Sequence, residues 1–247
     1  MIVMGYDLES TGLDVKTARI LEVGAVIWDT EKQIPIDIFS CFVRDVEILP
    51  EYLPALAING IDPKWLAGGI SLKDIFRSLY IICRQHKVEA VVAHNGGNYD
   101  KPLTMNEMAR LYLPEQESIL EFPWIDSLTD LPFKREPKSR SLNHLAADHG
   151  FINPFQHRAV FDVLTMLKIM SHYDFQEVLQ LSKIPFVTVR ALVTYDERQL
   201  AKDMRFSWAE LGDKKYPGFW VKRIRENQLE KEQKLAEEKG FKIIRIE

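Results

Sequence analysis

Two carboxylates stand one residue apart near the start of the chain, where an apolar run ends. Asp7 and Glu9 follow the apolar residues 2–4 and precede the turn-like pair Thr11-Gly12. On a β-strand, residues i and i+2 point to the same face, so the two side chains would lie close together. Like charges that close repel each other, and burying them is costly unless a cation joins them. The pattern therefore predicts a site for Mg²⁺ or Mn²⁺, which prefer carboxylate oxygens.

A motif this short also has an ordinary explanation. About one Asp-x-Glu is expected by chance in a chain of this size, and the motif occurs here at 7/9, 29/31 and 45/47. The second and third copies follow the ends of apolar strands, which is typical of solvated turns. Only the first copy lies between an apolar strand and a glycine turn, so only that copy is a candidate metal site.

A third acidic candidate lies in the stretch HRAVFDVLTMLKIM, residues 157–170. From 159 to 170 only Asp162, Thr165 and Lys168 are not apolar, which predicts a mostly buried helix. These three residues could form a polar stripe that faces water. Alternatively, Asp162 points toward the first two carboxylates and completes a metal site, with the imidazole of His157 beside it.

An apolar strand runs into a Gly-Gly loop and then into Asp100 in the stretch VVAHNGGNYD, residues 91–100. Loops at the carboxyl ends of strands commonly carry function in α/β folds. The alternative is an ordinary strand-to-helix turn in which Asp100 caps the following helix.

Hydrophobic periodicity predicts the elements that would position these residues. We expect strands at residues 2–9, 20–28, 36–43, 88–93 and 124–127. We expect helices at residues 71–86, 101–112, 141–149 and 159–172, with a long loop of short helical pieces at 49–69. The first three strands are close enough in sequence for an antiparallel meander, and the helix before 88–93 predicts a parallel crossover. Together they indicate a mixed α/β sheet flanked by helices.

Composition limits the class of protein. The chain has 247 residues, of which 46% are hydrophobic, enough for one large domain and a smaller module. Cys41 and Cys83 lie in apolar surroundings, so we expect no disulfide and a reduced, cytoplasmic location. No apolar run approaches 18 residues, and the N-terminus lacks a secretory leader, so we expect no membrane partner.

The chain changes character near residue 184, and we divide it into a main domain at 1–183 and a small α+β module at 184–247. Residues 186–247 carry 14 Lys/Arg and 11 Asp/Glu, a net charge of +3 against −7 for the first 185. In the module we expect strands at 186–193, 220–221 and 241–246, and helices at 197–204 and 223–239, the second solvated and laced with salt bridges.

Two tryptophans of this module, Trp208 and Trp220, stand among cations. The cations are Lys214, Lys215, Lys222, Arg223 and Arg225. Aromatic residues interleaved with cations suit single-stranded nucleic acid. The alternative, which we favour for the tryptophans, is that they form the core of the module. The role of the lysines stays open.

Together these stretches resemble the DEDDh exonucleases, the family of bacterial proofreading subunits, exonuclease X and ribonuclease T. DLESTGL is similar to the first motif of that family, AHNGGNYD to the second and HRAVFD to the third. The resemblance covers roughly residues 1–175. One departure is that Asp100 lies six residues after His94, where the family usually has five, and that Tyr99 replaces a phenylalanine. Glycines at 96 and 97 can absorb such an insertion through unusual backbone angles.

The resemblance implies an RNase H-like sheet and two-metal phosphodiester hydrolysis with two Mg²⁺ or Mn²⁺ ions. Asp7 would bridge both ions, Glu9 and Asp162 would hold the ion that activates water, and Asp100 would support the other. His157 would take the proton from the nucleophile. The terminal nucleotide would be held by the first-motif turn and the start of the second motif, that is, by Ser10, Thr11, Gly12, Leu13, His94 and Asn95.

We therefore expect a 3′→5′ exonuclease that acts on single-stranded or frayed 3′ ends of DNA and releases nucleoside 5′-monophosphates. A replication or repair protein on a separate chain would be a partner. One alternative is an exoribonuclease of the same family. Another is a nucleic-acid-binding adaptor that keeps the fold and has lost activity, which the insertion before Asp100 would permit.

Overall fold

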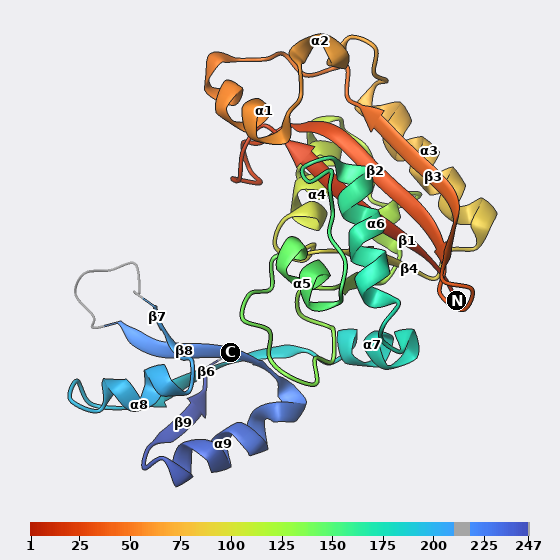
Figure 1. Ribbon diagram of the computed structural model, residues 1–247. Coiled ribbons are helices and arrows are strands. Elements are labelled where there is room, and N and C mark those ends of the chain that lie inside the picture. Colours follow the sequence, from red (N-terminus) through yellow and green to blue (C-terminus); the bar gives the residue numbers. More distant parts are fainter. Residues whose placement is uncertain (210–217, 247) are drawn as a thin grey trace. The chain divides into compact units, whose positions relative to one another are not determined.

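The computed structural model describes residues 1–209 and 218–246 (Figure 1). The chain divides into two compact units, Met1–Ser182 and Lys183–Glu247. The lysines at 214 and 215, considered above as part of a basic surface, lie outside the described residues. Among the described residues, no helix combines the length and the apolar character needed to cross a membrane.

The first unit is built on a five-stranded mixed sheet in the order β3-β2-β1-β4-β5. Its strands are β1 (Ile2–Ser10), β2 (Ile20–Asp29), β3 (Ile34–Phe42), β4 (Ala90–Ala93) and β5 (Trp124–Asp126). The first three strands pair antiparallel, and β4 pairs parallel with both β1 and β5. The predicted mixed sheet is confirmed, including the meander and the parallel crossover.

Helices cover both faces of this sheet, and alternation along β1 divides its side chains between two cores. Met4, Tyr6 and Leu8 belong to the core that contains residues of α3 (Leu72–His86) and α4 (Asp100–Arg110). Val3 belongs to the other core, with α5, α6 and α7. These three helices span Leu142–Asp148, Ala159–Met170 and Phe175–Ser182. Asp7 and Glu9 have the parity of Val3, so they face the side of the sheet that α6 covers.

The long connection after β3 contains only short elements, as expected. They are η1 (Pro50–Tyr52), α1 (Leu53–Asn59) and α2 (Pro63–Leu66). Elsewhere in the chain, between α4 and β5, a further short turn, η2, spans Ile119–Glu121. The Ser71 side chain accepts a hydrogen bond from the Asp74 backbone N–H and so begins α3. The sequence did not predict α7, which is only two turns long.

The second unit is a small α+β fold with a four-stranded sheet in the order β7-β8-β6-β9. Its strands are β6 (Phe186–Leu192), β7 (Ser207–Ala209), β8 (Phe219–Arg225) and β9 (Lys242–Arg245). Its helical segments are α8 (Arg198–Asp203), η3 (Glu226–Gln228) and α9 (Leu229–Glu238). Its core takes alternate residues of β6, Val187, Val189 and Ala191, together with Ala201 of α8 and Ala236 of α9.

The prediction of a helix over 223–239 is wrong at its start. Arg223 and Arg225 lie in β8, and the α-helix begins at Leu229. The cause is long-range: β8 pairs antiparallel with β6, which places Ile224 in the core and Arg225 opposite Phe186. The Arg225 side chain is buried, donates to the Ile184 carbonyl and lies over the Phe186 ring. The run of charges suggested a solvated helix because this pairing is not visible locally.

Candidate active site

The first two carboxylates lie on β1, where the start of α6 meets the sheet. Asp7 is paired across the sheet with Gly24 of β2. A Cβ atom at Gly24 would stand 2.4 Å from the Val160 backbone nitrogen and 2.8 Å from the Ala159 Cβ. Only glycine therefore allows the first turn of α6 to approach the sheet this closely, and that approach brings Asp162 to the face that carries Asp7 and Glu9.

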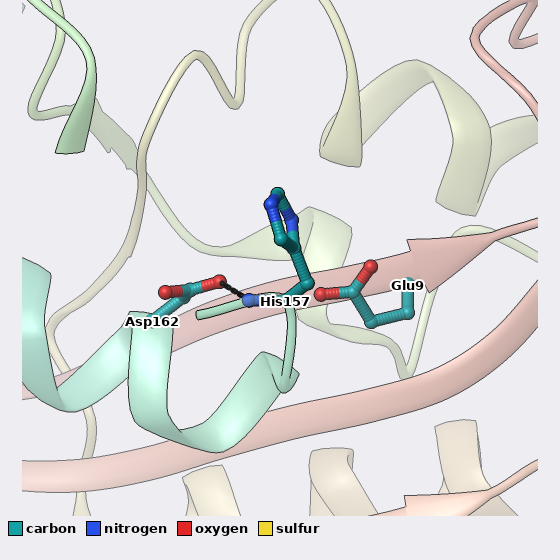
Figure 2. Close-up of side chains that lie close together, drawn as sticks. All are labelled: Glu9, His157 and Asp162. Carbon is teal, nitrogen blue, oxygen red and sulfur yellow. Dashed lines mark hydrogen bonds between the residues drawn. The ribbon is translucent and has the colours of Figure 1, made fainter. Parts of the chain in front are cut away.

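Figure 2 shows the side chains of Glu9 and Asp162 with His157 between them. A ligand atom from each of these three residues lies within 4.8 Å of the others. The Asp162 carboxylate accepts a hydrogen bond of 3.1 Å from the His157 backbone N–H and a second from the Asn153 side chain. The His157 backbone has a positive φ of 60°. These bonds hold the segment before α6 in a left-handed turn that places the imidazole beside the two carboxylates.

The alternative of a solvated polar stripe on α6 is wrong. Thr165 is buried, and its hydroxyl donates to the Phe161 carbonyl within the helix. Of the three polar residues of this helix, Lys168 is the exposed one, at the far end from the carboxylates.

Asp100 is the first residue of α4 and is only 2% exposed. Its Oδ1 atom is buried and has no hydrogen-bond partner among the described residues. The extra residue before Asp100 is accommodated in the loop between β4 and α4. The Asp126 carboxylate holds this loop, because it accepts hydrogen bonds from the backbone N–H groups of Asn95 at 2.8 Å and Gly97 at 3.2 Å. A Cβ atom at Gly96 would lie 2.4 Å from the Ala93 Cβ, so this loop requires a glycine there.

The carboxylates of this cluster raise one another's pKa. Burial first, and then the charges of Asp100, Glu9 and Asp162, raise the pKa of Asp7 well above its usual value. Burial and the charge of Asp162 raise the pKa of Glu9 to about 8. Burial raises the pKa of Asp100 to about 7. The pKa of Asp162 is raised by burial, against the hydrogen bonds that lower it. The charges of Asp100, Glu9 and Asp162 thus all act on Asp7, and of the four predicted acids Glu9 and Asp162 are the pair whose ligand atoms lie within 4.8 Å of each other and of His157 among the described residues.

This donor set fits hard divalent cations. Four clustered carboxylates in a low-dielectric site keep their protons unless positive charge compensates them. The orphan Oδ1 of Asp100 is an acceptor that a cation, directly or through water, would satisfy. Carboxylate oxygens are suitable ligands for Mg²⁺ or Mn²⁺.

The turn after β1 is tied to residues from distant parts of the chain. The Tyr99 hydroxyl donates to the Gly12 carbonyl at 2.6 Å and also contacts the Ser10 hydroxyl. The Asn59 side chain donates to the Ser10 carbonyl at 3.0 Å. Leu13 projects from this turn and is 91% exposed. The tyrosine that replaces the usual phenylalanine therefore fixes the turn through its hydroxyl.

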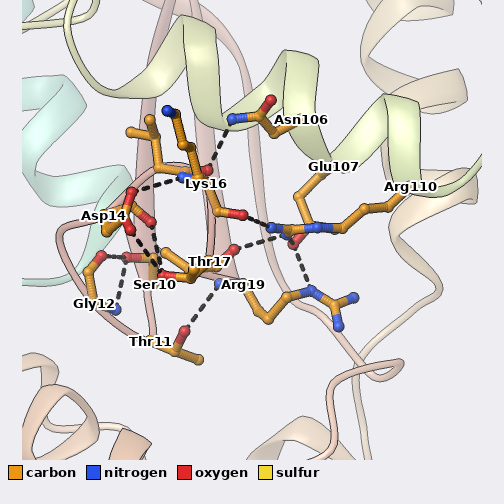
Figure 3. A network of polar contacts seen from close by, with 12 residues as sticks. Ser10, Thr11, Gly12, Asp14, Lys16, Thr17, Arg19, Asn106, Glu107 and Arg110 are labelled. Carbon is orange, nitrogen blue, oxygen red and sulfur yellow. Dashed lines mark hydrogen bonds and ion pairs between the residues drawn. The ribbon is translucent and has the colours of Figure 1, made fainter.

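Figure 3 shows a second set of bonds that joins this turn to α4. Glu107, fully buried in α4, accepts from Arg19 at 2.7 Å and from Arg110 at 3.0 Å. Arg110 also donates to the backbone carbonyls of Lys16 and Ala18. In addition, the hydroxyl of Thr11 accepts from the Arg19 backbone N–H. The helix that begins with Asp100 thus also holds the segment that contains Thr11.

His94 occupies a different set of contacts from those of the acidic cluster. Its Nδ1 lies 2.8 Å from the Ser127 hydroxyl, and its Nε2 lies 2.9 Å from the Arg140 carbonyl. Asn95 has a positive φ of 63°, and its side chain accepts from Asn98. Both residues shape the loop before Asp100, and their contact with a nucleotide stays a prediction.

Sequence reasoning missed a fifth carboxylate, Glu22. It is directly opposite Glu9 on β2, so it shares the face of the cluster, and it is 1% exposed. Arg158, the residue before α6, binds it through Nε and Nη2, each at 3.1 Å. The guanidinium also lies over the rings of Phe42 and Trp65. A charged residue inside the otherwise apolar run of β2 was the one signal that could have identified Glu22.

The family model described as an exonuclease matches residues 4–170, about two thirds of the chain. The chain belongs to the exonuclease family. The resemblance to DEDDh exonucleases is confirmed, and the RNase H-like sheet of this exonuclease is the fold of that family. The protein is therefore an enzyme, a nuclease that hydrolyses phosphodiester bonds.

Solved structures of the same fold include two kinds of nuclease. The nuclease domain of 3′hExo, a DEDDh family member bound to rAMP, superimposes with a TM-score of 0.59 and 13% identity, covering 69% of this exonuclease and 90% of that chain. The zinc-bound complex of E. coli exonuclease I with single-stranded DNA gives a TM-score of 0.62 and 16% identity. That match covers 97% of this exonuclease and 67% of the E. coli chain.

A second family model, described as a domain of unknown function (DUF8626), matches residues 187–236 of this exonuclease. A search of curated proteins found no significant match.

Proposed function

We propose that this protein is a metal-dependent 3′→5′ exonuclease that removes nucleoside 5′-monophosphates from single-stranded DNA ends. The observation that carries the proposal is the cluster of Asp7, Glu9, Asp100 and Asp162, in which the charges of the other three act on Asp7, with a ligand atom of His157 within 4.8 Å of Glu9 and Asp162. Segments from three distant parts of the sequence supply these groups. A buried cluster of uncompensated carboxylates is costly for stability, so its presence indicates function.

In this proposal the carboxylates of Asp7, Glu9, Asp100 and Asp162 would hold two divalent cations. When bound, they supply positive charge that stabilises the attacking and leaving oxygens of an in-line displacement. The zinc-bound form of E. coli exonuclease I supports a divalent cation in this fold.

His157 acts as the general base. Its side chain is exposed to solvent while its backbone is fixed by the bond to Asp162. A neutral imidazole accepts a proton near neutral pH. It can therefore take the proton of the attacking water at the edge of the cluster.

The turn at residues 10–13 receives the terminal nucleotide. Ser10 and Gly12 are fixed by Tyr99, and the exposed Leu13 side chain offers an apolar surface for a base. In this proposal the last phosphodiester of the strand lies over the carboxylates beside this turn, as expected for attack from the 3′ end. A partner protein in replication or repair stays a prediction from the sequence.

Preference for DNA is supported by matches that cover most of this chain. Structures of E. coli exonuclease I with a dT13 or a dA16 oligonucleotide match 91% and 97% of this chain. The match to the nuclease domain of 3′hExo bound to rAMP covers 69%.

A product assay tests the proposal. Single strands of DNA and RNA with matched sequences, labelled at either end, are incubated with the protein and Mg²⁺ or Mn²⁺. We expect 5′-labelled DNA to shorten one nucleotide at a time, and 3′-labelled DNA to release its label at once as a mononucleotide. Cleavage of RNA with intact DNA would replace the DNA assignment by the exoribonuclease alternative.

The adaptor alternative requires a separate control. Asp162→Asn should bind the labelled strand but lose more than about 100-fold in rate, since loss of an outer partner of a metal ligand already costs 10- to 100-fold. A protein that binds strands and never shortens them with Mn²⁺ would support the adaptor instead.

A further inference from the structure

The second unit has a pocket whose walls combine aromatic rings with arginines. Its volume is about 440 Å³, within the usual range for ligand sites. The large side chains that line it are those of Arg190, Tyr195, Arg198, Trp208, Phe219 and Trp220. All of them belong to the second unit, far in sequence from the catalytic motifs.

Two of these rings are exposed to solvent. Trp208 is 49% exposed and Tyr195 is 77% exposed. Trp220, directly opposite Trp208 in the sheet, is half-buried, and the two ring centroids are 5.4 Å apart in an edge-on arrangement. The expectation that both tryptophans form the core is therefore wrong for Trp208. Residues of β6, α8 and α9 form the core of the second unit, and Trp208 is not among the core residues. Packing in the core therefore does not account for a tryptophan at this position.

The arginines lie against other rings of the same pocket. The Arg190 guanidinium carbon is 3.5 Å from the centroid of the Phe219 ring, and that of Arg198 is 3.9 Å from the centroid of Tyr195. Arg190 Nε is buried without a hydrogen-bond partner among the described residues. Arg198 donates from Nη1 to the Tyr195 carbonyl. A guanidinium stacked on a ring keeps the N–H groups at its edge available for phosphate oxygens.

We propose that this pocket binds a nucleotide of single-stranded nucleic acid, with a base stacked on Trp208 and the flanking phosphate at Arg198 or Arg190. The inference rests on the proposed function, because it places a second contact with the same strand. Exposed aromatic faces beside arginines suit bases of any sequence. The net charge of +3 in residues 186–247, against −7 in the rest of the chain, favours a polyanion at this unit.

Binding to the full chain in EDTA, where hydrolysis does not occur, tests this inference. The probe is a fluorescently labelled oligodeoxythymidine, and the readout is its anisotropy. Trp208→Ala and Tyr195→Ala should each weaken binding, the former about 10-fold, as loss of one stacked base does. Trp208→Phe keeps a ring and should lose much less. Circular dichroism identifies any variant that fails to fold. If Trp208→Ala fails to fold, Tyr195→Ala provides the second test, because the Tyr195 side chain is mostly exposed.

Charge is tested separately from stacking. Arg198→Ala should lower the slope of log affinity against log salt concentration by about 0.7, the value for one phosphate of a single strand. Lys234→Ala removes a charge from an exposed position on α9 and should leave the slope and the affinity unchanged. A strand of the same length with abasic sites should bind the unmodified protein as weakly as oligodeoxythymidine binds Trp208→Ala.

Failure of this inference can be distinguished from failure of the proposed function. The p-nitrophenyl ester of thymidine 5′-monophosphate carries one nucleotide and cannot occupy both sites, so its hydrolysis should be equal in all these variants. If folded Trp208→Ala and Tyr195→Ala bind the strand like the unmodified protein, or if the abasic strand binds equally well, the pocket is not a base site. An inactive protein whose binding still depends on Trp208 would reject only the proposed function.

Discussion

The ion pair between Glu22 and Arg158 gives the sharpest quantitative prediction. Glu22 is 1% exposed and contacts one guanidinium through both carboxylate oxygens, whereas the Arg158 side chain is 34% exposed. Arg158→Met would leave a buried carboxylate opposite Glu9 with no counter-charge.

The expected cost lies between two limits. Breaking a fully buried pair costs about 3–5 kcal/mol, and an exposed pair contributes about 0–1 kcal/mol. Because one partner is buried and the other is one-third exposed, we expect Arg158→Met to lower the free energy of unfolding by about 2–3 kcal/mol in EDTA. The double variant Glu22→Met, Arg158→Met replaces the pair by apolar side chains, so it should recover most of that loss.

Hydrogen exchange of the β2 amides measures this effect in the first unit alone. Arg44→Met is the matched control, since Arg44 and Asp45 form an exposed pair with a separation of 3.9 Å, and it should cost less than about 1 kcal/mol. Saturating Mg²⁺ should reduce the cost of Arg158→Met, because bound cations compensate the same negative charge. If Arg158→Met costs no more than the control, or if the double variant is no more stable than the single one, Glu22 does not depend on Arg158 in the way described.

Three further predictions concern the active site. His157→Ala should lower kcat by about 100- to 10,000-fold, as loss of a general base does, with a much smaller change in Mg²⁺ affinity by isothermal titration; undiminished turnover would exclude that role. The metal-free protein should lose stability as pH rises from about 4 to about 8. Folding raises the pKa of Glu9 to about 8 and that of Asp100 to about 7. Over this pH interval the folded state therefore holds protons that the unfolded chain releases. Thermal melts in EDTA measure this loss, which Mg²⁺ should reverse; a melting temperature that rises over the same interval would contradict it. Glu107→Gln should lower the free energy of unfolding by about 1–3 kcal/mol, because it weakens charge-assisted bonds to two arginines. It should also raise KM more than it lowers kcat, since it loosens the turn that receives the nucleotide. A fall in kcat at constant KM would argue against this.

Most of the first unit was predictable because its signals are local. Alternation placed Asp7 and Glu9 on one face of a strand, and an apolar run placed Asp162 on a buried helix. The strand, the glycine turn and the helix each depend on neighbours within a few residues. The mixed sheet then followed from the order of these elements, because a helix between two strands favours a parallel crossover.

The errors and omissions arose where contacts cross long stretches of sequence. The charged run at 223–225 forms a strand because β6 pairs with it, although its composition favours a solvated helix. The exposure of Trp208 depends on which residues close the core of the second unit. The bonds of the Tyr99 hydroxyl to the turn after β1 join residues that are 87 and 89 positions apart.

The sequence by itself determined which residue types could do chemistry, the order in which they occur, and that Asp7 and Glu9 share one face of a strand. Only the tertiary structure decided that Glu22 joins the cluster and is paired with Arg158, and that Gly24 lets α6 approach Asp7. The physical reason is the separation along the chain of the residues that interact. Periodicity reports how one segment divides its surface between core and solvent, whereas the charge balance of a site depends on cross-strand register and helix packing, which are settled only when distant segments meet.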